Sequence, residues 1–198
     1  DLVRKGEPFV KRIHAMDPDI ILQGAIFEIV TTDVDNVAIP ASVFNEFGIK
    51  PEARNFRYKD MLYSFRRRVD HWSKGASVPD MSRLETRMWF FYVGKRWIDM
   101  GLEAIHFGQV EIMDDRDRDH AHWRDMMKRI RKYAGKHARR HLVLADAHTP
   151  SGGIVHEGEL MFDLHSFPSR PKSVKGKPYE AILEKSFSDS IYGRSKGG

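Results

Sequence analysis

The sequence predicts a parallel-stranded α/β fold, arranged as part of a (β/α)8 TIM barrel. Short apolar runs alternate along the chain with longer segments of helical periodicity, which is the order expected for strands joined by right-handed helical crossovers. Each predicted strand also ends in charged or polar residues, as strands do at the active face of such folds. A doubly wound open sheet would give the same order of elements. We favour an incomplete barrel that forms one domain over residues 1–198, because the chain starts at Asp1 within a predicted helix and stops at "YGRSKGG" without a closing element.

The first part of the chain predicts a helix, a strand and a long insertion. Residues 2–16 predict the helix, and the near-continuous apolar run at 18–30 predicts a strand that is buried on both faces. Residues 31–81 are mostly irregular, with a short helix expected at 40–48. Loops of this length are uncommon in compact α/β units and usually build the active site. We therefore expect this insertion on the active face.

The second part of the chain repeats the alternation of helix and strand. Residues 82–101 predict a buried helix, in which Ser82 and Glu85 would form a capping box and Gly101 would end the helix. The remaining expected elements are a strand at 103–113, an amphipathic helix at 119–137, strands at 141–149 and 159–167, and a Lys- and Pro-rich loop at 168–178.

Composition excludes several classes of protein. No apolar run approaches the ~20 residues of a membrane-spanning helix, and no signal-peptide pattern opens the chain. The chain has no Cys, which excludes disulfides and thiolate zinc sites and is consistent with a cytoplasmic protein, although many exported bacterial proteins also lack Cys. The net charge of +5 is concentrated on the polar face of the helix at 119–137, without a nucleic-acid-binding motif beside it. We expect neither a membrane nor a nucleic-acid partner.

The strand ends carry the candidate chemistry. The four predicted strands end in Glu28, in Gln109 and Glu111, in Asp146 and His148, and in Asp163 and His165. The two-residue period of a strand places the two members of each pair on one face. A single charged strand end is common, but four in succession indicate a functional rim, because buried carboxylates cost several kcal/mol unless they are paired. His106 and His141 are expected to be ordinary structural residues.

Two chemistries use such a rim. Glycosidic bond hydrolysis needs an acid and a second carboxylate, about 5 to 9.5 Å apart, and we assign Glu111 as general acid/base and Glu28 as its partner. The alternative is a hydrolase or lyase that binds a divalent metal through both D-x-H pairs, Asp146 with His148 and Asp163 with His165. Without that metal no cofactor is expected. A third alternative is a barrel that binds carbohydrate without catalysis.

Substrate-binding residues are expected around the two acids. Gln109 would hydrogen-bond the substrate, and the two D-x-H pairs would line the rest of the rim. The insertion adds His71 and Trp72 among several arginines, and such groups stack on sugar rings or bind hydroxyls. The partner expected is therefore a carbohydrate or another small polar molecule. The same residues would alternatively pin a loop that has little secondary structure.

The strand-end motifs also carry a resemblance. The runs "DPDIILQGAIFEIV", "EAIHFGQVE" and "LADAHTPSGG", followed by "LMFDLHSFP", resemble the central part of bacterial (β/α)8-barrel proteins related to glycoside hydrolases. The resemblance covers about residues 17–168 and implies a barrel fold and a carbohydrate-type substrate. One departure stands out, because Gln109-Val110-Glu111 replaces the Asn-Glu pair that is typical of the acid/base strand in the large retaining-glycosidase clan.

Overall fold

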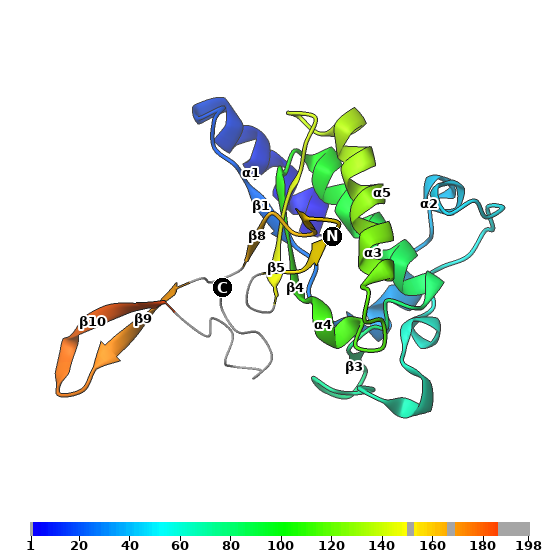
Figure 1. Cartoon of the computed structure of the whole chain (residues 1–198). Coiled ribbons are helices and arrows are strands. Elements are labelled where there is room, and N and C mark those ends of the chain that lie inside the picture. Colours follow the sequence, from blue (N-terminus) through cyan, green and yellow to red (C-terminus); the bar gives the residue numbers. More distant parts are fainter. Residues whose placement is uncertain (1, 150–152, 166–168, 186–198) are drawn as a thin grey trace.

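The structure, a computed structural model, describes residues 2–149, 153–165 and 169–185 (Figure 1). The α-helices are α1 (Leu2–Met16), α2 (Ala41–Glu46), α3 (Leu84–Met100), α4 (Val110–Met113) and α5 (Ala121–His137). The strands are β1 (Gln23–Ala25), β2 (Val30–Thr31), β3 (Ala76–Ser77), β4 (Ala104–Gln109), β5 (Leu144–His148), β6 (Val155–His156), β7 (Glu159–Leu160), β8 (Leu164–His165), β9 (Ser169–Val174) and β10 (Lys177–Lys185). Three short 3-10 helices lie in the insertion, at Thr32–Asn36, Tyr58–Met61 and Ser64–Arg66.

A four-stranded parallel sheet forms the centre of the molecule. Its strand order, β1-β4-β5-β8, follows the order of the chain, and all three pairings are parallel. Helix α3 crosses from β1 to β4, and α5 crosses from β4 to β5. The prediction of a parallel α/β fold is confirmed. Barrel closure is not seen in the described residues, where the sheet is open with β1 and β8 at its edges.

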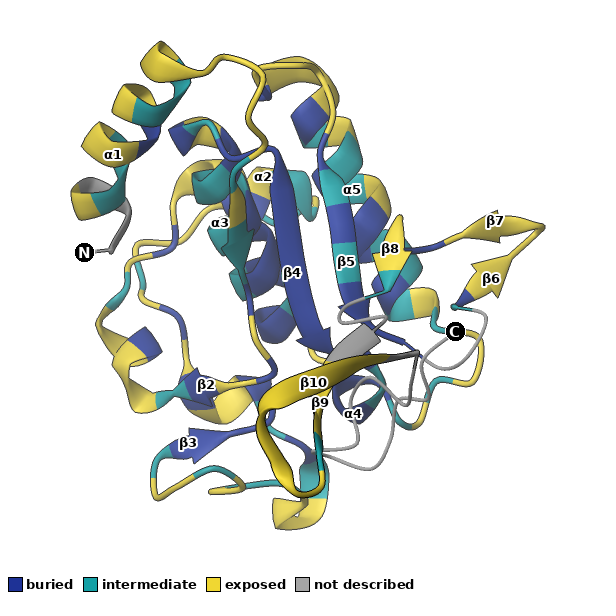
Figure 2. Ribbon diagram, turned by 90° about the vertical axis from the view of Figure 1, so that its left-hand side faces the viewer, coloured by how far each residue is buried: buried dark blue, intermediate teal, exposed yellow. Residues whose placement is uncertain are grey.

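Helices α3 and α5 cover one face of this sheet, as Figure 1 shows. Apolar side chains fill the space between the layers: the rings of Phe107 and Trp123 lie 5.6 Å apart, and a methyl group added at Gly94 would lie 3.1 Å from Ile130. Trp123 is fully buried, and its Nε1 donates to the Val110 carbonyl at 3.1 Å. One face of the sheet therefore packs against α3 and α5 in the core, and these two helices do not cover the other face (Figure 2).

Helix α1 is attached at the amino end of β4 through a buried carboxylate. Glu103 is 1% exposed and pairs with Arg139 at 2.9 Å and Arg140 at 2.8 Å, both of which follow α5. The same two arginines donate to the Pro18 carbonyl at 2.7 and 2.9 Å, just after α1. His14 of α1 lies 3.7 Å from Glu103. This network joins three segments that are distant in sequence.

The long helices appear close to the predicted positions. Helix α1 coincides with the predicted 2–16, α5 lies within 119–137, and α3 ends at Gly101 in the left-handed conformation, as expected. The expected capping box is wrong, because Arg83 is the N-cap and makes no side-chain cap. Glu85 instead accepts two bonds from Arg54, at 2.7 and 2.9 Å, which fasten the insertion to α3.

Several predicted strands are shorter than expected. The run 18–30 contributes only β1 and the start of β2, and Phe27 between them is 53% exposed. The predicted strand 103–113 ends at Gln109, where α4 begins. Residues 159–167 contain β7, paired with β6, and then β8. The expected loop at 168–178 is wrong, because β9 and β10 form an antiparallel hairpin that projects from the body (Figure 1).

Candidate functional site

The carboxyl end of β4 contains one extra residue. Ile105 and His106 pair with Ala145 and Asp146 in simple register, but the next pair joins Gln109 to His148, one residue later than expected. The bulge contains Gly108, whose φ is +61°. A bulge of this kind re-aims the side chains beyond it. Gln109 therefore lies on the same face as His106, the face that is free of α3 and α5.

The bulge positions the carboxylate of Glu28. Glu28 follows β1, is 6% exposed and accepts two hydrogen bonds from Gln109, from the backbone N at 2.9 Å and from Nε2 at 2.8 Å. A Cβ at position 108 would lie 1.9 Å from Glu28 Oε2, so only glycine leaves room for the carboxylate. Trp72 Nε1 donates to the Glu28 carbonyl at 2.9 Å. Glu28 is thus fixed at the edge of the sheet where catalytic groups lie in parallel α/β folds.

A pocket of about 320 Å³ lies on the helix-free face of β1, β4 and β5. His106 Nδ1 lies 3.0 Å from Asp146 Oδ2, and Gln23 Nε2 donates to Asp146 Oδ1 at 2.5 Å. The His106 ring contacts Phe27 at 5.4 Å and His148 at 5.0 Å between centroids, both edge to face. The pocket is lined by Gln23, Gly24, Ala25, Phe27, His106, Asp146 and His148.

This arrangement can exchange protons. A carboxylate that accepts from one ring nitrogen of a histidine fixes the orientation of the ring and stabilises its protonated form. Gln23 holds the carboxylate from its other side, so the chain Gln23–Asp146–His106 is fixed before any substrate binds. The exposed Phe27 ring adds an apolar wall. His106 is expected from the sequence to be an ordinary structural residue, and the register of β4 and β5 places it directly opposite Asp146.

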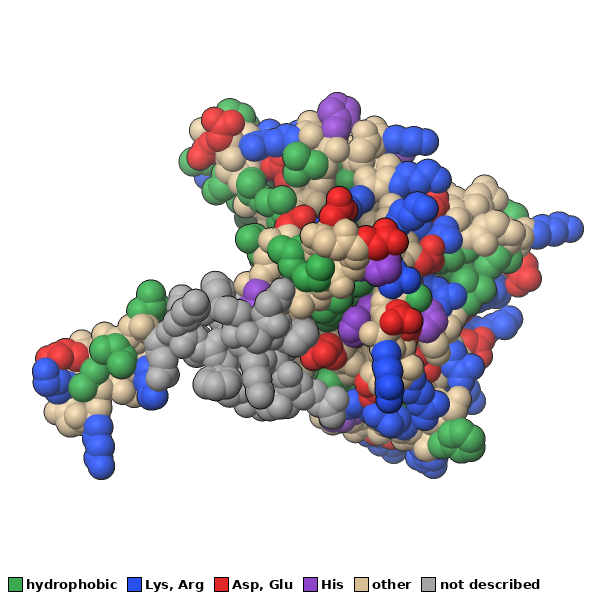
Figure 3. All heavy atoms as spheres, in the orientation of Figure 1, with side chains coloured by type: hydrophobic (Ala, Val, Ile, Leu, Met, Phe, Trp, Pro, Cys, Tyr) green, Lys and Arg blue, Asp and Glu red, His purple; other side chains and the backbone are tan. Residues whose placement is uncertain are grey.

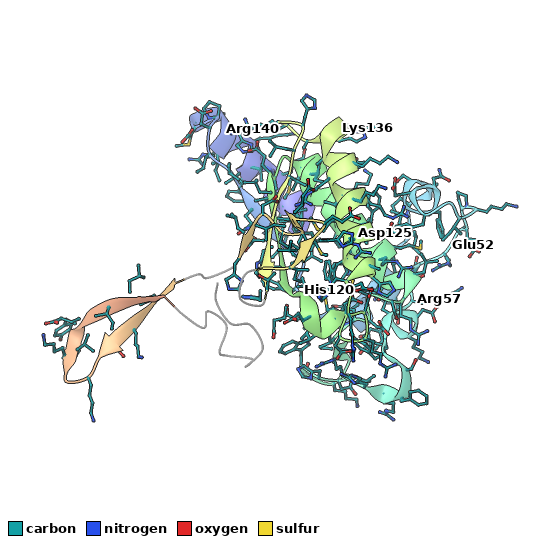
Figure 4. All side chains as sticks on the ribbon, viewed as in Figure 1. Glu52, Arg57, His120, Asp125, Lys136 and Arg140 are labelled. Atoms are coloured by element: carbon teal, nitrogen blue, oxygen red, sulfur yellow. The ribbon has the colours of Figure 1, made fainter. Side chains whose placement is uncertain are left out.

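Glu111 lies in a different cavity. It belongs to α4 and not to a strand, so the prediction that it shares a strand face with Gln109 is wrong. The surrounding cavity has a volume of about 430 Å³ and is lined by Glu111, Asp114, Asp115, Asp117, Arg118 and His120. Glu28 is absent from this lining. Figure 4 labels His120, which lies where the chain enters α5.

Two side chains of the segment between α4 and α5, Asp114 and Asp117, converge with His122 from the first turn of α5. His122 Nδ1 lies 2.9 Å from Asp114 Oδ1 and 3.0 Å from Asp117 Oδ2. Burial raises the pKa of Asp114 to about 6, against the opposing effect of His122. Burial also tends to raise the pKa of Asp117, but hydrogen bonds from backbone amides and the charge of His122 outweigh it, and the pKa is lowered. Figure 3 shows acidic, histidine and basic side chains close together on this part of the surface.

The two D-x-H pairs do not assemble one four-ligand site. His165 pairs in register with Ala147, whereas Asp146 pairs with Leu164, so the two D-x-H pairs lie on opposite faces of the sheet. Asp163 accepts from the Ala145 amide at 2.7 Å and from Arg131 of α5 at 3.1 Å. His165 Nδ1 lies 2.9 Å from Thr149 Oγ1. Asp146 and His148 share one face of β5 as predicted, but the register between β5 and β8 turns His165 to the other face.

His71 and Trp72 hold the insertion rather than line the pocket. Their rings meet edge to face at 4.7 Å, and Trp72 packs against the core while donating to the Glu28 carbonyl. The alternative of a pinned loop describes Trp72 better than a substrate contact does. The insertion nevertheless lies at the carboxyl end of the sheet, because the Met81 amide donates to the Met113 carbonyl of α4 at 2.8 Å.

Five candidate functional residues were not predicted from the sequence: Gln23, Phe27, Asp114, Asp117 and His122. The last three belong to the run "DDRDRDHAH" (114–122), whose four aspartates and two histidines were a signal for such a cluster. Asp117 does serve the helix start, because its Oδ2 accepts from the His122 amide at 3.2 Å. The contact of Asp117 with the His122 ring exists only in the folded chain.

Comparison with known proteins gives no assignment: no family model matches the chain, and no curated protein is significantly similar to it. Among the described residues, no helix combines the length and apolarity needed to cross a membrane.

Proposed function

We propose that this chain carries the site of a glycosidase-like hydrolase, which acts on a carbohydrate-type substrate in the pocket of His106 and Asp146. The observation that carries the proposal is the fixed chain Gln23–Asp146–His106 in a pocket of about 320 Å³ on the helix-free face of a parallel sheet. Sites of α/β enzymes lie at the carboxyl ends of such strands. The pocket size suits one small polar molecule.

Two groups share the chemistry in this proposal. His106, oriented by Asp146, donates a proton to the leaving oxygen of the glycosidic bond. We assign the base to Glu28, which Gln109 holds just after β1 and which is not among the residues that line this pocket; it accepts a proton from the water that attacks the sugar carbon. The bond from that carbon to the leaving oxygen breaks as the bond to the water oxygen forms. This assignment keeps Glu28 as the second carboxylate of the original hypothesis and moves the acid from Glu111 to His106.

The proposal is tested by variants that change chemistry without changing size. Purified chain is assayed against a panel of nitrophenyl glycosides, and Asp146→Asn and Glu28→Gln are compared with the parent on the best substrate. We expect each variant to lose about 100-fold or more in kcat, the typical contribution of a general acid or base. Asp163→Asn is the matched control, because Asp163 lies on the opposite face and should retain activity.

Three results would count against this assignment. Equal turnover by Asp146→Asn and the parent would exclude the His106–Asp146 pair as the acid. Sugar binding that raises the melting temperature without any turnover would favour a carbohydrate-binding module. A parent that neither cleaves a glycoside nor is stabilised by any sugar would remove the carbohydrate hypothesis.

A further inference from the structure

The segment between α4 and α5 and the first turn of α5 together bring close three atoms that metals bind. Single donor atoms of Asp114, Asp117 and His122 lie within 4.8 Å of one another. His122 Nδ1 is 2.9 Å from Asp114 Oδ1 and 3.0 Å from Asp117 Oδ2. Neighbouring ligands of an octahedral ion with bonds of about 2.1 Å lie about 3.0 Å apart. The two separations from His122 thus match neighbouring corners of one coordination sphere, and all three donor atoms lie within 4.8 Å of one another.

An unsatisfied buried oxygen points to a missing partner. Asp114 is 4% exposed; its Oδ1 pairs with His122, while its Oδ2 is buried and has no hydrogen-bond partner among the described residues. A buried carboxylate oxygen without a partner is costly unless a cation or a hydrogen-bond donor reaches it. The cluster alone would therefore leave part of this charge uncompensated.

The surroundings supply space and further negative charge. Asp114 and Asp117 line both the cavity of about 430 Å³ and a second cavity of about 290 Å³. Asp80, which is 6% exposed, lines the second cavity. The nearby Arg67 and Arg68 form ion pairs with Asp115 rather than with the cluster. Arg118 lines the first cavity and Arg116 the second, and in the described part of the chain neither forms an ion pair with Asp114 or Asp117.

We propose that Asp114, Asp117 and His122 bind one divalent transition-metal ion of the Mn²⁺ or Zn²⁺ type, with water from the cavities completing its coordination. One imidazole nitrogen and two carboxylate oxygens form a donor set that these ions accept, and three protein ligands leave positions open, as in catalytic metal sites. Glu111 lines the same cavity as Asp114 and Asp117. The site shares no lining residue with the pocket of His106, so it stands independently of the glycosidase proposal.

A direct binding measurement tests this site. The full chain is freed of metal with a chelator, the chelator is removed, and MnCl₂ or ZnCl₂ is titrated by calorimetry. We expect one equivalent to bind, and Asp117→Asn and His122→Gln to weaken binding by at least about 10-fold. The matched control is Asp119→Asn, an exposed carboxylate of the same segment, which should leave binding unchanged. Circular dichroism checks that each variant is folded.

A spectroscopic measurement identifies the ligands. Pulsed electron paramagnetic resonance of the Mn²⁺ complex should show coupling to an imidazole nitrogen in the parent and in Asp119→Asn, and should lose it in His122→Gln. If Asp117→Asn fails to fold because Asp117 also supports the start of α5, His122→Gln still decides the question. Absence of stoichiometric binding by the parent, or equal binding by the parent and His122→Gln, would overturn the proposal and leave the cluster as a hydrogen-bonded helix start.

Discussion

Replacing Gly108 with alanine tests how tightly the bulge of β4 holds Glu28. An added Cβ would lie 1.9 Å from Glu28 Oε2 and 3.1 Å from its carboxyl carbon, so the carboxylate must move. Movement breaks its two hydrogen bonds with Gln109, at 2.9 and 2.8 Å. Because Glu28 is 6% exposed, water cannot fully replace these bonds. The substitution should therefore destabilise the fold well beyond the ordinary cost of losing a glycine.

The magnitude follows from two contributions. Alanine at a φ of +61° costs about 1 kcal/mol in backbone strain. Hydrogen bonds to a charged group contribute roughly 1.5 to 3 kcal/mol each, and partial loss of the two gives about 3 kcal/mol more. We expect Gly108→Ala to lower the free energy of unfolding by about 4 kcal/mol. For a chain of this size each kcal/mol lowers the melting temperature by about 2 to 4 °C.

The assay is urea unfolding of Gly108→Ala beside Gly48→Ala. Gly48 has a φ of +68° and no atom within 4 Å of an added Cβ, so its replacement carries the backbone strain alone, about 1 kcal/mol. In a Glu28→Ala background the cost of Gly108→Ala should fall to the same value, because the clash is gone. Equal losses for Gly108→Ala and Gly48→Ala in the parent background would refute the reasoning.

Three further predictions concern stability. Arg54→Met should cost about 3 kcal/mol in urea unfolding and expose the insertion to proteolysis, because it leaves Glu85, 7% exposed, without its two-bond partner; a loss below 1 kcal/mol would contradict this. The second prediction is made for the metal-free chain, with a chelator present. Because the pKa of Asp114 is raised in the folded state, the stability that Asp114 contributes should be fully present below its unfolded pKa near 3.9 and be lost as the pH rises through about 6. Asp114→Asn should then match the parent at pH 4 and exceed it at pH 8 by up to about 3 kcal/mol, and a flat difference across urea titrations at these pH values would refute it. Gly24→Ala should cost about 1 to 2 kcal/mol and shift the fluorescence of Trp97, whose ring lies 3.0 Å from the added Cβ, and an unchanged spectrum would argue against this contact.

The positions of the long helices could be predicted from local sequence periodicity. The apolar spacing in α5 and the glycine after α3 are short-range signals, and the structure places both as expected. The cap of α3 was not predictable in the same way, because Glu85 bonds to Arg54, 31 residues away, rather than to its own helix start. The signal in "VEIM" (110–113) is equally compatible with the end of a strand and with one helical turn, and the turn forms.

The site was only partly predictable because strand alternation does not define register. Alternation placed Asp146 with His148 correctly but could not show that Asp163 faces the other side. The bulge at Gly108 adds one residue to β4 and so moves Gln109 to the other face of the sheet. A lone glycine in a strand is only a weak signal for such a bulge. The contact between His106 and Asp146 likewise depends on the register of β4 and β5, which the sequence does not reveal.

The network around Glu103 has a consequence for the order of folding. The Pro18 carbonyl meets Arg139 across a sequence separation of 121 residues, so this contact closes a long loop and its entropic cost must be met by other interactions first. The partners of the α1 region lie at the end of α3, at Met100 and Leu102, and after α5, at Arg139 and Arg140, so they assemble only when these distant segments have come together. Docking of α1 becomes a late event, and substitutions that weaken it, such as Val10→Ala in its small apolar cluster, should accelerate unfolding while leaving the refolding rate nearly unchanged.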